Sequence, residues 1–353
     1  MDVPKLQYEA VITVPPLKIT VPRRFRQVLL SHPNVDTAEK FRGCYQVVMY
    51  YESENQEDFG WVLAGWIVES LGIALSEHPM LAGRLQKKAD GEGGDTEMEI
   101  VSNDCGIRMA EARISVDLSD FLESSEKHNL EHELVFWKDI DEQSPEFSPL
   151  FYVQVTNFKC GGYSIGISCS LLLADILVVD DFLKKWADIH NNEVLCNRET
   201  RTPLFYHPRL KSQEAPPPNI IRRTPYKNGG ESLLFKITCE ENGEFERESA
   251  ELCVQEAEKK LQRKMGSEFG LFLKEPSEVV KVETCEYSRQ GLGLKSQMKS
   301  TSWDEFGVYD ISFHEEKRPV HVSRWIGSAS EGNVVVVKYP KDGVSAVILV
   351  TLN

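Results

Sequence analysis

The sequence predicts a mixed α/β protein of two domains, and three observations support this fold class. Short apolar runs rich in β-branched residues alternate with segments of helical spacing, as expected for mixed sheets with covering helices. Glycine-containing turns separate several of the runs. The composition changes over residues 197–230, where six prolines lie among charged residues. A chain of 353 residues suits about two domains and buries a core without the help of a metal or disulfide.

The elements before residue 197 follow from periodicity and from the positions of proline and glycine. Alternating or continuous apolar runs predict strands, spacings of three and four predict helices, and prolines end both. In order, the predicted elements are a strand over 9–14 ended by Pro15 and Pro16, a strand over 43–51, a helix over 61–75 stopped by Pro79, an acidic turn over 89–96 between strands, a hairpin of 151–158 and 163–170 joined by Cys160-Gly161-Gly162, and a helix over 180–190.

The proline-rich segment is the predicted domain boundary. We expect an N-terminal domain over 1–196, a crossover linker over 197–230 that is extended around its three consecutive prolines, and a C-terminal domain over 231–353. The elements predicted in the C-terminal domain are a strand over 232–238, a helix whose apolar face runs from Ala250 to Leu261, and a final hairpin of 334–337 and 344–352 around the turn 340–343.

Charge excludes some partners. Lys and Arg total 40 against 55 Asp and Glu, which gives a net charge of −15. This sign argues against nucleic-acid binding and against docking on anionic lipid through overall charge. No apolar run approaches the roughly 18 residues of a membrane span, and the N-terminus has no basic, then apolar, signal-peptide pattern. The eight cysteines contain no CxxC pair, so we expect reduced thiols in a cytosolic or nuclear setting or at the cytosolic face of an organelle, and of these we favour a cytoplasmic location.

Most of the familiar chemical motifs are missing. None of the eight histidines lies in an HExxH pattern, and His128 and His132, which a helix would place on one face, make only two ligands. We therefore expect no metal site. The glycine-rich stretch 91–94 is flanked by acidic residues and lacks a following Lys-Ser/Thr, so a surface turn is favoured over a phosphate loop. No G-x-S-x-G nucleophile elbow is present.

Asp175 is the most unusual carboxylate, because it lies in a stretch that is apolar on both sides. A buried aspartate is rare unless it is paired or hydrogen-bonded. Two interpretations are open at this point. Asp175 either caps a helix or pins a loop, or it belongs to a functional site.

Four stretches together resemble the plant BAHD acyltransferase family, in the right order and over nearly the whole chain. They are residues 77–85 (EHPMLAGRL), similar to the family's YPLAGRL; residues 149–162 (PLFYVQVTNFKCGG), similar to VQVTxFxCGG; residues 166–187, similar to GxxxxHxxxDGxxxxxFLxxWA; and residues 303–309 (WDEFGVY), where the family carries DFGWG. The hairpin followed by the Asp175 segment is the most specific of these matches.

The resemblance implies a two-domain fold of the chloramphenicol acetyltransferase type, with acyl-CoA as co-substrate and an alcohol or amine acceptor entering a channel between the domains. In the family, the histidine of HxxxD is the general base, the aspartate orients the loop, and DFGWG is structural; the last corresponds here to Glu305, Phe306 and Gly307. In this sequence, Leu171 stands where the family has the histidine. The segment after residue 231 is also shorter than the family's second domain.

Two hypotheses from different classes follow. Loss of a general base typically lowers a rate by about 10²–10⁴-fold, and together with a thinned CoA-side wall it favours a non-catalytic accessory protein. The hairpin through Asp175 most resembles the eceriferum-type branch, which implies a role with the fatty-acid elongase condensing enzyme in very-long-chain fatty acid and cuticular wax metabolism, at the cytosolic face of the endoplasmic reticulum. The alternative is an active acyl-CoA-dependent O- or N-acyltransferase. For that alternative, Cys169, Ser170 and His190 are the nearest reactive side chains, and none is a clear substitute base.

Overall fold

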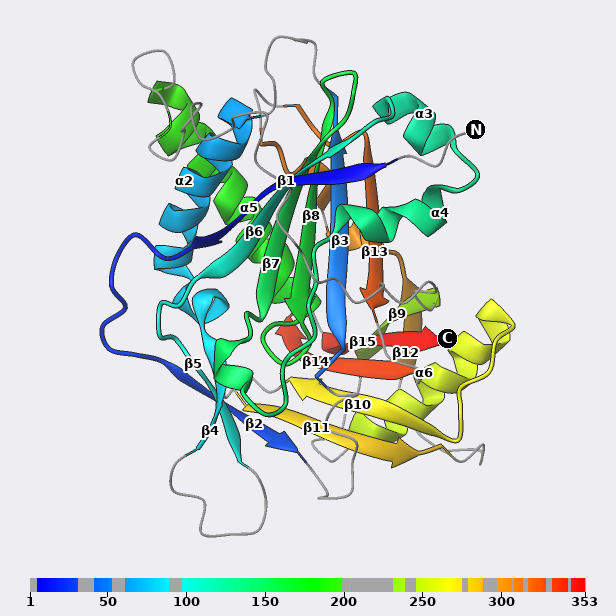
Figure 1. The fold of residues 1–353 in the computed structure, drawn as a ribbon. Helices are drawn as coiled ribbons and strands as arrows, with labels where there is room; N and C mark the ends of the chain where they lie inside the picture. The colour runs from blue at the N-terminus through cyan, green and yellow to red at the C-terminus, as the bar shows by residue number, and fades with distance from the viewer. Residues whose placement is uncertain are drawn as a thin grey trace.

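The computed structural model of the chain describes residues 5–30, 41–52, 61–88, 97–197, 203, 231–238, 246–274, 279–287, 297–306, 308–313, 317–327, 332–341 and 344–352. These residues form two mixed sheets with helices packed against them (Figure 1), which confirms the α/β class. In the described part of the chain, no helix is both long and apolar enough to cross a membrane.

The first sheet, sheet A, has six strands and carries helices on both faces. Its strands, in spatial order, are β1 (Leu6–Val14), β6 (Ile107–Ile114), β7 (Phe151–Asn157), β8 (Tyr163–Ser170), β3 (Cys44–Tyr51) and β13 (His321–Gly327). Helices α2 (Trp61–Glu77) and α5 (Ile176–Ile189) share the main core with one face. The short helices α3 (Leu118–Glu123) and α4 (Lys127–Leu130) lie over the other face (Figure 1). Helices can cover both faces because apolar side chains alternate along β3. Val47 and Met49 face the main core, whereas Val48 and Tyr50 face α3.

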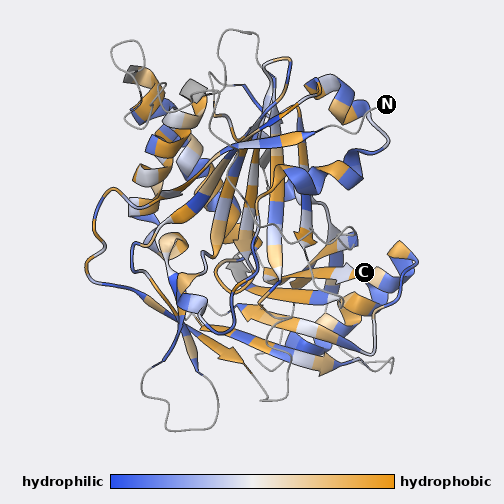
Figure 2. Ribbon diagram, viewed as in Figure 1, coloured by the Kyte–Doolittle hydropathy of each residue, from blue (hydrophilic) through white to orange (hydrophobic). Residues whose placement is uncertain are grey.

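The second sheet, sheet B, has nine strands and lies below sheet A in Figure 1. In order they are β12 (Gln297–Thr301), β9 (Glu231–Thr238), β15 (Val344–Leu352), β14 (Asn333–Lys341), β10 (Glu268–Lys274), β11 (Val279–Glu286), β2 (Phe25–Leu30), β5 (Met98–Val101) and β4 (Arg84–Lys87). Helix α6 (Glu246–Leu261) covers one face. On β14, Val334 and Val336 face α6, whereas Val335 and Val337 face the main core. The central strands β14 and β15 are therefore buried on both sides and are apolar along most of their length (Figure 2).

Each sheet takes strands from both sides of the proline-rich segment. Strand β13, from the C-terminal part of the chain, pairs antiparallel with β3 in sheet A. Strand β2, from the N-terminal part, pairs parallel with β11 in sheet B and brings β5 and β4 with it. The two parts of the chain are thus joined by backbone hydrogen bonds as well as by the shared core.

Most elements lie where the sequence places them. The strands predicted over 9–14, 43–51 and 232–238, the hairpin of β7 and β8, the helix after Trp61 and the C-terminal hairpin are all confirmed. The hairpin turn uses Gly161 at a φ of +92°, a conformation that glycine permits without strain. Two boundaries were wrong: the helix predicted over 180–190 begins at Ile176, and β14 continues to Lys341, two residues into the turn predicted over 340–343. The turn predicted over 89–96 and the linker over 197–230, apart from residues 197 and 203, lie outside the described residues.

Candidate functional site

The turn that connects β8 to α5 is the centre of the candidate site. It runs from Leu171 to Asp175, and Asp175 is the N-cap residue of α5. Its carboxylate accepts hydrogen bonds from the backbone N–H groups of Leu177, at 2.8 Å, and Val178, at 3.0 Å. These are two of the donors that a helix N-terminus leaves without a backbone partner. The capping interpretation of Asp175 therefore describes what the side chain does, and the cap explains why α5 begins four residues before the predicted start.

Leu171 fills its position completely. Its side chain is 1% exposed, and its backbone N–H donates to the carbonyl of Gly43 at 3.0 Å. A β-carbon at Gly43 would lie 2.9 Å from Leu171 Cδ1, so the leucine packs into space that only a glycine leaves open. The ring of Phe272 bounds the same space from sheet B. The position thus offers dispersion contacts and no proton acceptor.

Two cations from sheet B reach this turn. Lys274, at the end of β10, donates to the backbone carbonyl of Leu171, and Arg26, on β2, donates to the backbone carbonyl of Leu173. Lys274 is buried, on the core-facing side of its strand two residues after Phe272. Burial lowers the pKa of Lys274 to about 7, with Arg26 acting in the same direction and the negative charge of Asp175 opposing it. An amine of that pKa is partly neutral at physiological pH, so it has a free lone pair in part of the population.

The other side chains considered as substitute bases do not supply one. Burial raises the pKa of Cys169 to about 12, which keeps it a thiol. The hydroxyl of Ser170 accepts from the backbone N–H of Leu172 at 3.2 Å, inside the turn. His190 lies beyond the C-terminal end of α5, with its Nδ1 2.9 Å from the hydroxyl of Ser70. Since Asp175 lies at the opposite end of this helix, His190 is about 20 Å from the turn.

A second buried charge lies farther along α5. Arg324, on β13, forms an ion pair with Asp180 at 3.1 Å and donates to the hydroxyl of Tyr45 at 3.2 Å. Its guanidinium also lies 5.6 Å from the centre of the Trp303 ring, which stacks on Tyr45. Burial raises the pKa of Asp180 to about 6, and Arg324 opposes this rise. The cluster ties β13 and the segment that begins at Trp303 to α5 and to Tyr45 of the neighbouring strand β3.

Glu305, which the sequence comparison places in a structural motif, lies at the surface. Its carboxylate accepts from Lys236 of β9 at 2.6 Å, and this bond lowers the pKa of Glu305. Exposed pairs of this kind contribute little stability. The side chain of Phe306 and the whole of Gly307 lie outside the described residues. Within this motif it is Trp303, rather than Glu305, that joins the core.

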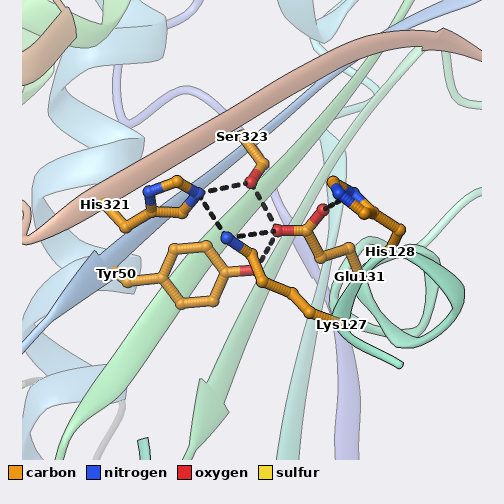
Figure 3. Close-up of polar contacts among 6 residues, drawn as sticks. All are labelled: Tyr50, Lys127, His128, Glu131, His321 and Ser323. Atoms are coloured by element: carbon orange, nitrogen blue, oxygen red, sulfur yellow. Dashed lines mark hydrogen bonds and ion pairs between the residues drawn. The ribbon is translucent and has the colours of Figure 1, made fainter. Parts of the chain in front are cut away.

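A polar cluster that the sequence did not reveal surrounds Glu131 (Figure 3). Its carboxylate accepts from the hydroxyl of Tyr50 at 3.1 Å and from the hydroxyl of Ser323, and it forms an ion pair with Lys127 at 3.7 Å. His321 Nε2 lies 2.6 Å from Lys127 Nζ and 3.1 Å from Ser323 Oγ. Burial and the Lys127 charge lower the pKa of His321, so its neutral ring accepts from the lysine.

This Glu131 cluster contains a serine, a histidine and a carboxylate, but not in the order of a catalytic triad. In a triad the carboxylate orients the histidine, which in turn faces the serine. Here the carboxylate binds Ser323 directly. The arrangement instead attaches edge strand β13 to the segment around α4.

The two histidines that were considered as metal ligands do not lie on one helix, because α4 ends at Leu130. His128 pairs with Glu131, and His132 pairs with Glu133. Among the described residues, no group of three or more His, Cys, Asp or Glu side chains is arranged to hold a metal ion.

A polar cavity of about 680 Å³ lies at the C-terminal end of α5. Its lining comes from α5, from the residues that follow it and from the segment 310–312. The volume suits a small ligand. Its lining residue on α5 that lies nearest in sequence to the turn is Lys184, nine residues after Asp175 and about 14 Å along the helix, so the cavity and the Leu171 turn are separate sites.

The comparison with known protein families decides the identity of the fold. A model of the Transferase family matches residues 29–232, which is more than half of the chain. The chain belongs to the Transferase (BAHD) family.

Curated relatives match over parts of their length. Brassinosteroid-related acyltransferase 1 of Arabidopsis thaliana is 33% identical over 160 residues, which are 43% of this chain and 33% of the relative. Hydroxycinnamoyltransferase of Narcissus pseudonarcissus is 30% identical over 49% of this chain and 40% of the relative. Protein ECERIFERUM 26 of Arabidopsis thaliana is 33% identical over 39% of this chain and 30% of the relative. These matches thus span less than half the length of each relative.

Solved structures also match. Vinorine synthase aligns with 98% of this chain and 94% of its own, at 12% identity and a TM-score of 0.49. TRI101 of F. graminearum, complexed with coenzyme A and deoxynivalenol, aligns with 94% of this chain and 95% of its own, at 11% identity and a TM-score of 0.46.

BAHD membership gives the motif residues a context. In the segment that resembles YPLAGRL, Arg84 is buried and donates to the carbonyls of Gly83, at 2.9 Å, and Gly106, at 2.8 Å. In the segment that resembles the HxxxD region, the turn is held by Asp175 from within and by Lys274 and Arg26 from sheet B. Nothing in the sequence around Lys274 indicates that it contacts this turn. Its inward orientation does follow from the alternation of side chains along a strand, because Lys274 lies two residues after the core-facing Phe272.

Proposed function

We propose that this BAHD-family protein is a catalytically degenerate member that acts as a non-catalytic accessory protein. The observation that supports this most directly is Leu171, an apolar side chain that is 1% exposed where the family resemblance places the general base. The turn carrying it is fixed by Asp175, Lys274 and Arg26. A leucine accepts no proton from an acceptor hydroxyl or amine.

The matches to ECERIFERUM proteins support the finer form of this proposal. In that form, the protein contacts a fatty-acid elongase condensing enzyme at the cytosolic face of the endoplasmic reticulum and influences the chain length of very-long-chain products. The segment 231–353 is then a shortened second domain, and acyl-CoA is a ligand that the protein does not turn over.

A second candidate function is acyl transfer with Lys274 as the base, and the lowered pKa of Lys274 favours it. The neutral amine would take the proton from an acceptor hydroxyl or amine. The acceptor oxygen or nitrogen would attack the thioester carbonyl of acyl-CoA, and the C–S bond would break. The departing thiolate of CoA would then take the proton from the Lys274 ammonium. This is general-base catalysis by an amine from sheet B that contacts the backbone carbonyl of Leu171.

The experiment begins with calorimetric titration of the folded protein with CoA and with a long-chain acyl-CoA. Micromolar binding would show that the cofactor half of the channel is present. Chromatographic detection of released CoA, with a panel of alcohols and amines as acceptors, then measures transfer. The accessory proposal expects no release above the uncatalysed rate from the unmodified protein, and robust transfer would overturn it.

Two variants separate the candidates. Leu171→His restores the family's base and, on the accessory proposal, still gives no robust transfer. Lys274→Met removes the amine while keeping a side chain of similar length. If the unmodified protein transfers acyl groups and Lys274→Met lowers that rate at least 100-fold with the fold intact, the second function replaces the first. Co-expression with an elongase condensing enzyme, with product chain lengths as the readout, tests the accessory role directly.

A further inference from the structure

The segment between β1 and β2 exposes an unusual set of apolar side chains. Leu17 is 49% exposed, Ile19 85%, Val21 84% and Phe25, the first residue of β2, 53%. Ile19 and Val21 are the two most exposed large apolar side chains among the described residues. The segment lies at the left edge of the molecule in Figure 1, and Figure 2 shows apolar and polar residues mixed along it.

The backbone of this segment is held in place by hydrogen bonds at four residues, Leu17, Lys18, Thr20 and Arg24. The N–H of Leu17 donates to the carbonyl of Gly72 at 3.0 Å. Thr20 donates to both carboxylate oxygens of Asp104, through its N–H at 2.8 Å and its hydroxyl at 2.6 Å. The N–H of Arg24 donates to the hydroxyl of Ser102 at 2.7 Å. The anchors lie on either side of Ile19 and Val21, so the two side chains are presented outward by a fixed loop.

Basic side chains alternate with the apolar ones. Lys18, Arg23 and Arg24 are exposed, and residues 15–26 contain no acidic residue. The carboxylate of Asp104 contacts the segment, and both of its oxygens accept hydrogen bonds from Thr20. The net charge of −15 comes from other parts of the chain. Exposed charges more than about 10 Å away are largely screened at physiological salt, so the local sign of the segment is positive.

We propose that this segment docks the protein on an anionic lipid bilayer. Ile19 and Val21 enter the boundary between headgroups and acyl chains, while Lys18, Arg23 and Arg24 contact the lipid phosphates. Apolar side chains beside basic ones are the pattern of interfacial binding. A bilayer accepts projecting side chains without a complementary pocket, whereas a protein partner would have to provide one. The inference rests on exposure and charge in this loop and does not depend on the proposed function.

The test is flotation of the purified full chain with vesicles of phosphatidylcholine alone or with 30% phosphatidylserine. The unmodified protein is expected to float with the anionic vesicles, and raising the salt from 0.1 to 0.5 M is expected to release it in part. Ile19→Ser with Val21→Ser is expected to lower the partition coefficient about 30-fold or more. Arg23→Ala with Arg24→Ala is expected to lower it roughly 30-fold on anionic vesicles and to have little effect on neutral ones.

A matched control is Val320→Ser. Val320 is an exposed branched residue, 47% accessible, which precedes β13 at the opposite edge of sheet A from β1. This variant is expected to bind as the unmodified protein does. The proposal is overturned if the folded protein ignores anionic vesicles, or if the Ile19/Val21 variant binds equally well. It is also overturned if sedimentation velocity shows a dimer in place of vesicle binding and the Ile19/Val21 variant abolishes that dimer, since the surface is then a protein interface.

Discussion

Replacement of Lys274 by methionine gives the sharpest test of the electrostatics at the turn. A pKa of about 7 in the folded protein, against an ordinary value of 10.5, means that the folded state resists protonation of this amine. At 1.36 kcal/mol per pH unit, the full difference corresponds to about 5 kcal/mol. Between pH 7 and pH 10.5 the unfolded chain binds a proton at Lys274 that the folded protein does not. The contribution of Lys274 to stability therefore rises with pH through this window and is constant below pH 7.

Methionine removes the titration and leaves a side chain of similar length. Between pH 7 and pH 9, the free energy of unfolding of the unmodified protein should gain about 2 kcal/mol from Lys274, and that of Lys274→Met should not. The variant also loses the hydrogen bond to the Leu171 carbonyl, but that loss is present at both pH values. The change in stability caused by the substitution should thus be about 2 kcal/mol more favourable at pH 7 than at pH 9.

The assay is urea unfolding under reducing conditions at the two pH values, followed by tryptophan fluorescence and far-ultraviolet circular dichroism. Lys264→Met, which removes an exposed lysine, is the control and should show the same stability change at both pH values. If Lys274→Met also shows the same change at both, the amine is not resisting protonation. The basis for treating Lys274 as a partly neutral base would then be gone.

Three further substitutions test other contacts in the same unfolding assay. Asp175→Ala should destabilise the protein by about 1 kcal/mol because two amides of α5 lose their acceptor, while Asp175→Asn should retain most of that stability; equal losses would mean that the cap is unimportant. Arg324→Met should cost about 3–5 kcal/mol by leaving Asp180 unpaired, and adding Asp180→Asn should restore part of it; no recovery in the double variant would argue against the pair. Glu131→Ala should cost about 3 kcal/mol by removing the shared acceptor of the cluster in Figure 3, and a loss below 1 kcal/mol would show that the cluster does not hold β13 in place.

Local patterns in the sequence predict the elements well where a pattern is complete within the element. The hairpin of β7 and β8 has two apolar runs and a glycine turn, and both strands and the turn are confirmed. The start of α5 was misplaced because Ile176 to Val179 is a β-branched run that resembles a strand end. Asp175 was considered as a helix cap, and the structure confirms the cap, but the helix itself was predicted to begin four residues later. A helix cap and a site carboxylate look alike until the amides that face them are known.

Contacts between distant parts of the chain could not be predicted in this way. Strand β13 joins sheet A, and β2 joins sheet B, through pairings that separate residues by more than 200 positions. Neither strand differs in its own pattern from one that pairs with a neighbour. The same limit hid the Glu131 cluster, in which α4 meets β13, and the reach of Lys274 to the Leu171 turn. In each case the chemistry depends on sheet order, which local periodicity does not determine.

The two candidate functions place different requirements on the turn between β8 and α5. A base for acyl transfer must meet the acceptor, so its lone pair needs an opening. Lys274 donates one hydrogen to the Leu171 carbonyl and, when neutral, keeps a lone pair, but its side chain is 6% exposed. Transfer through Lys274 therefore requires the turn to move away from sheet B, against the bonds that Lys274 and Arg26 make to its carbonyls. The proposed accessory role needs no such movement, because Lys274 and Arg26 then only hold sheet B against the turn that carries Leu171.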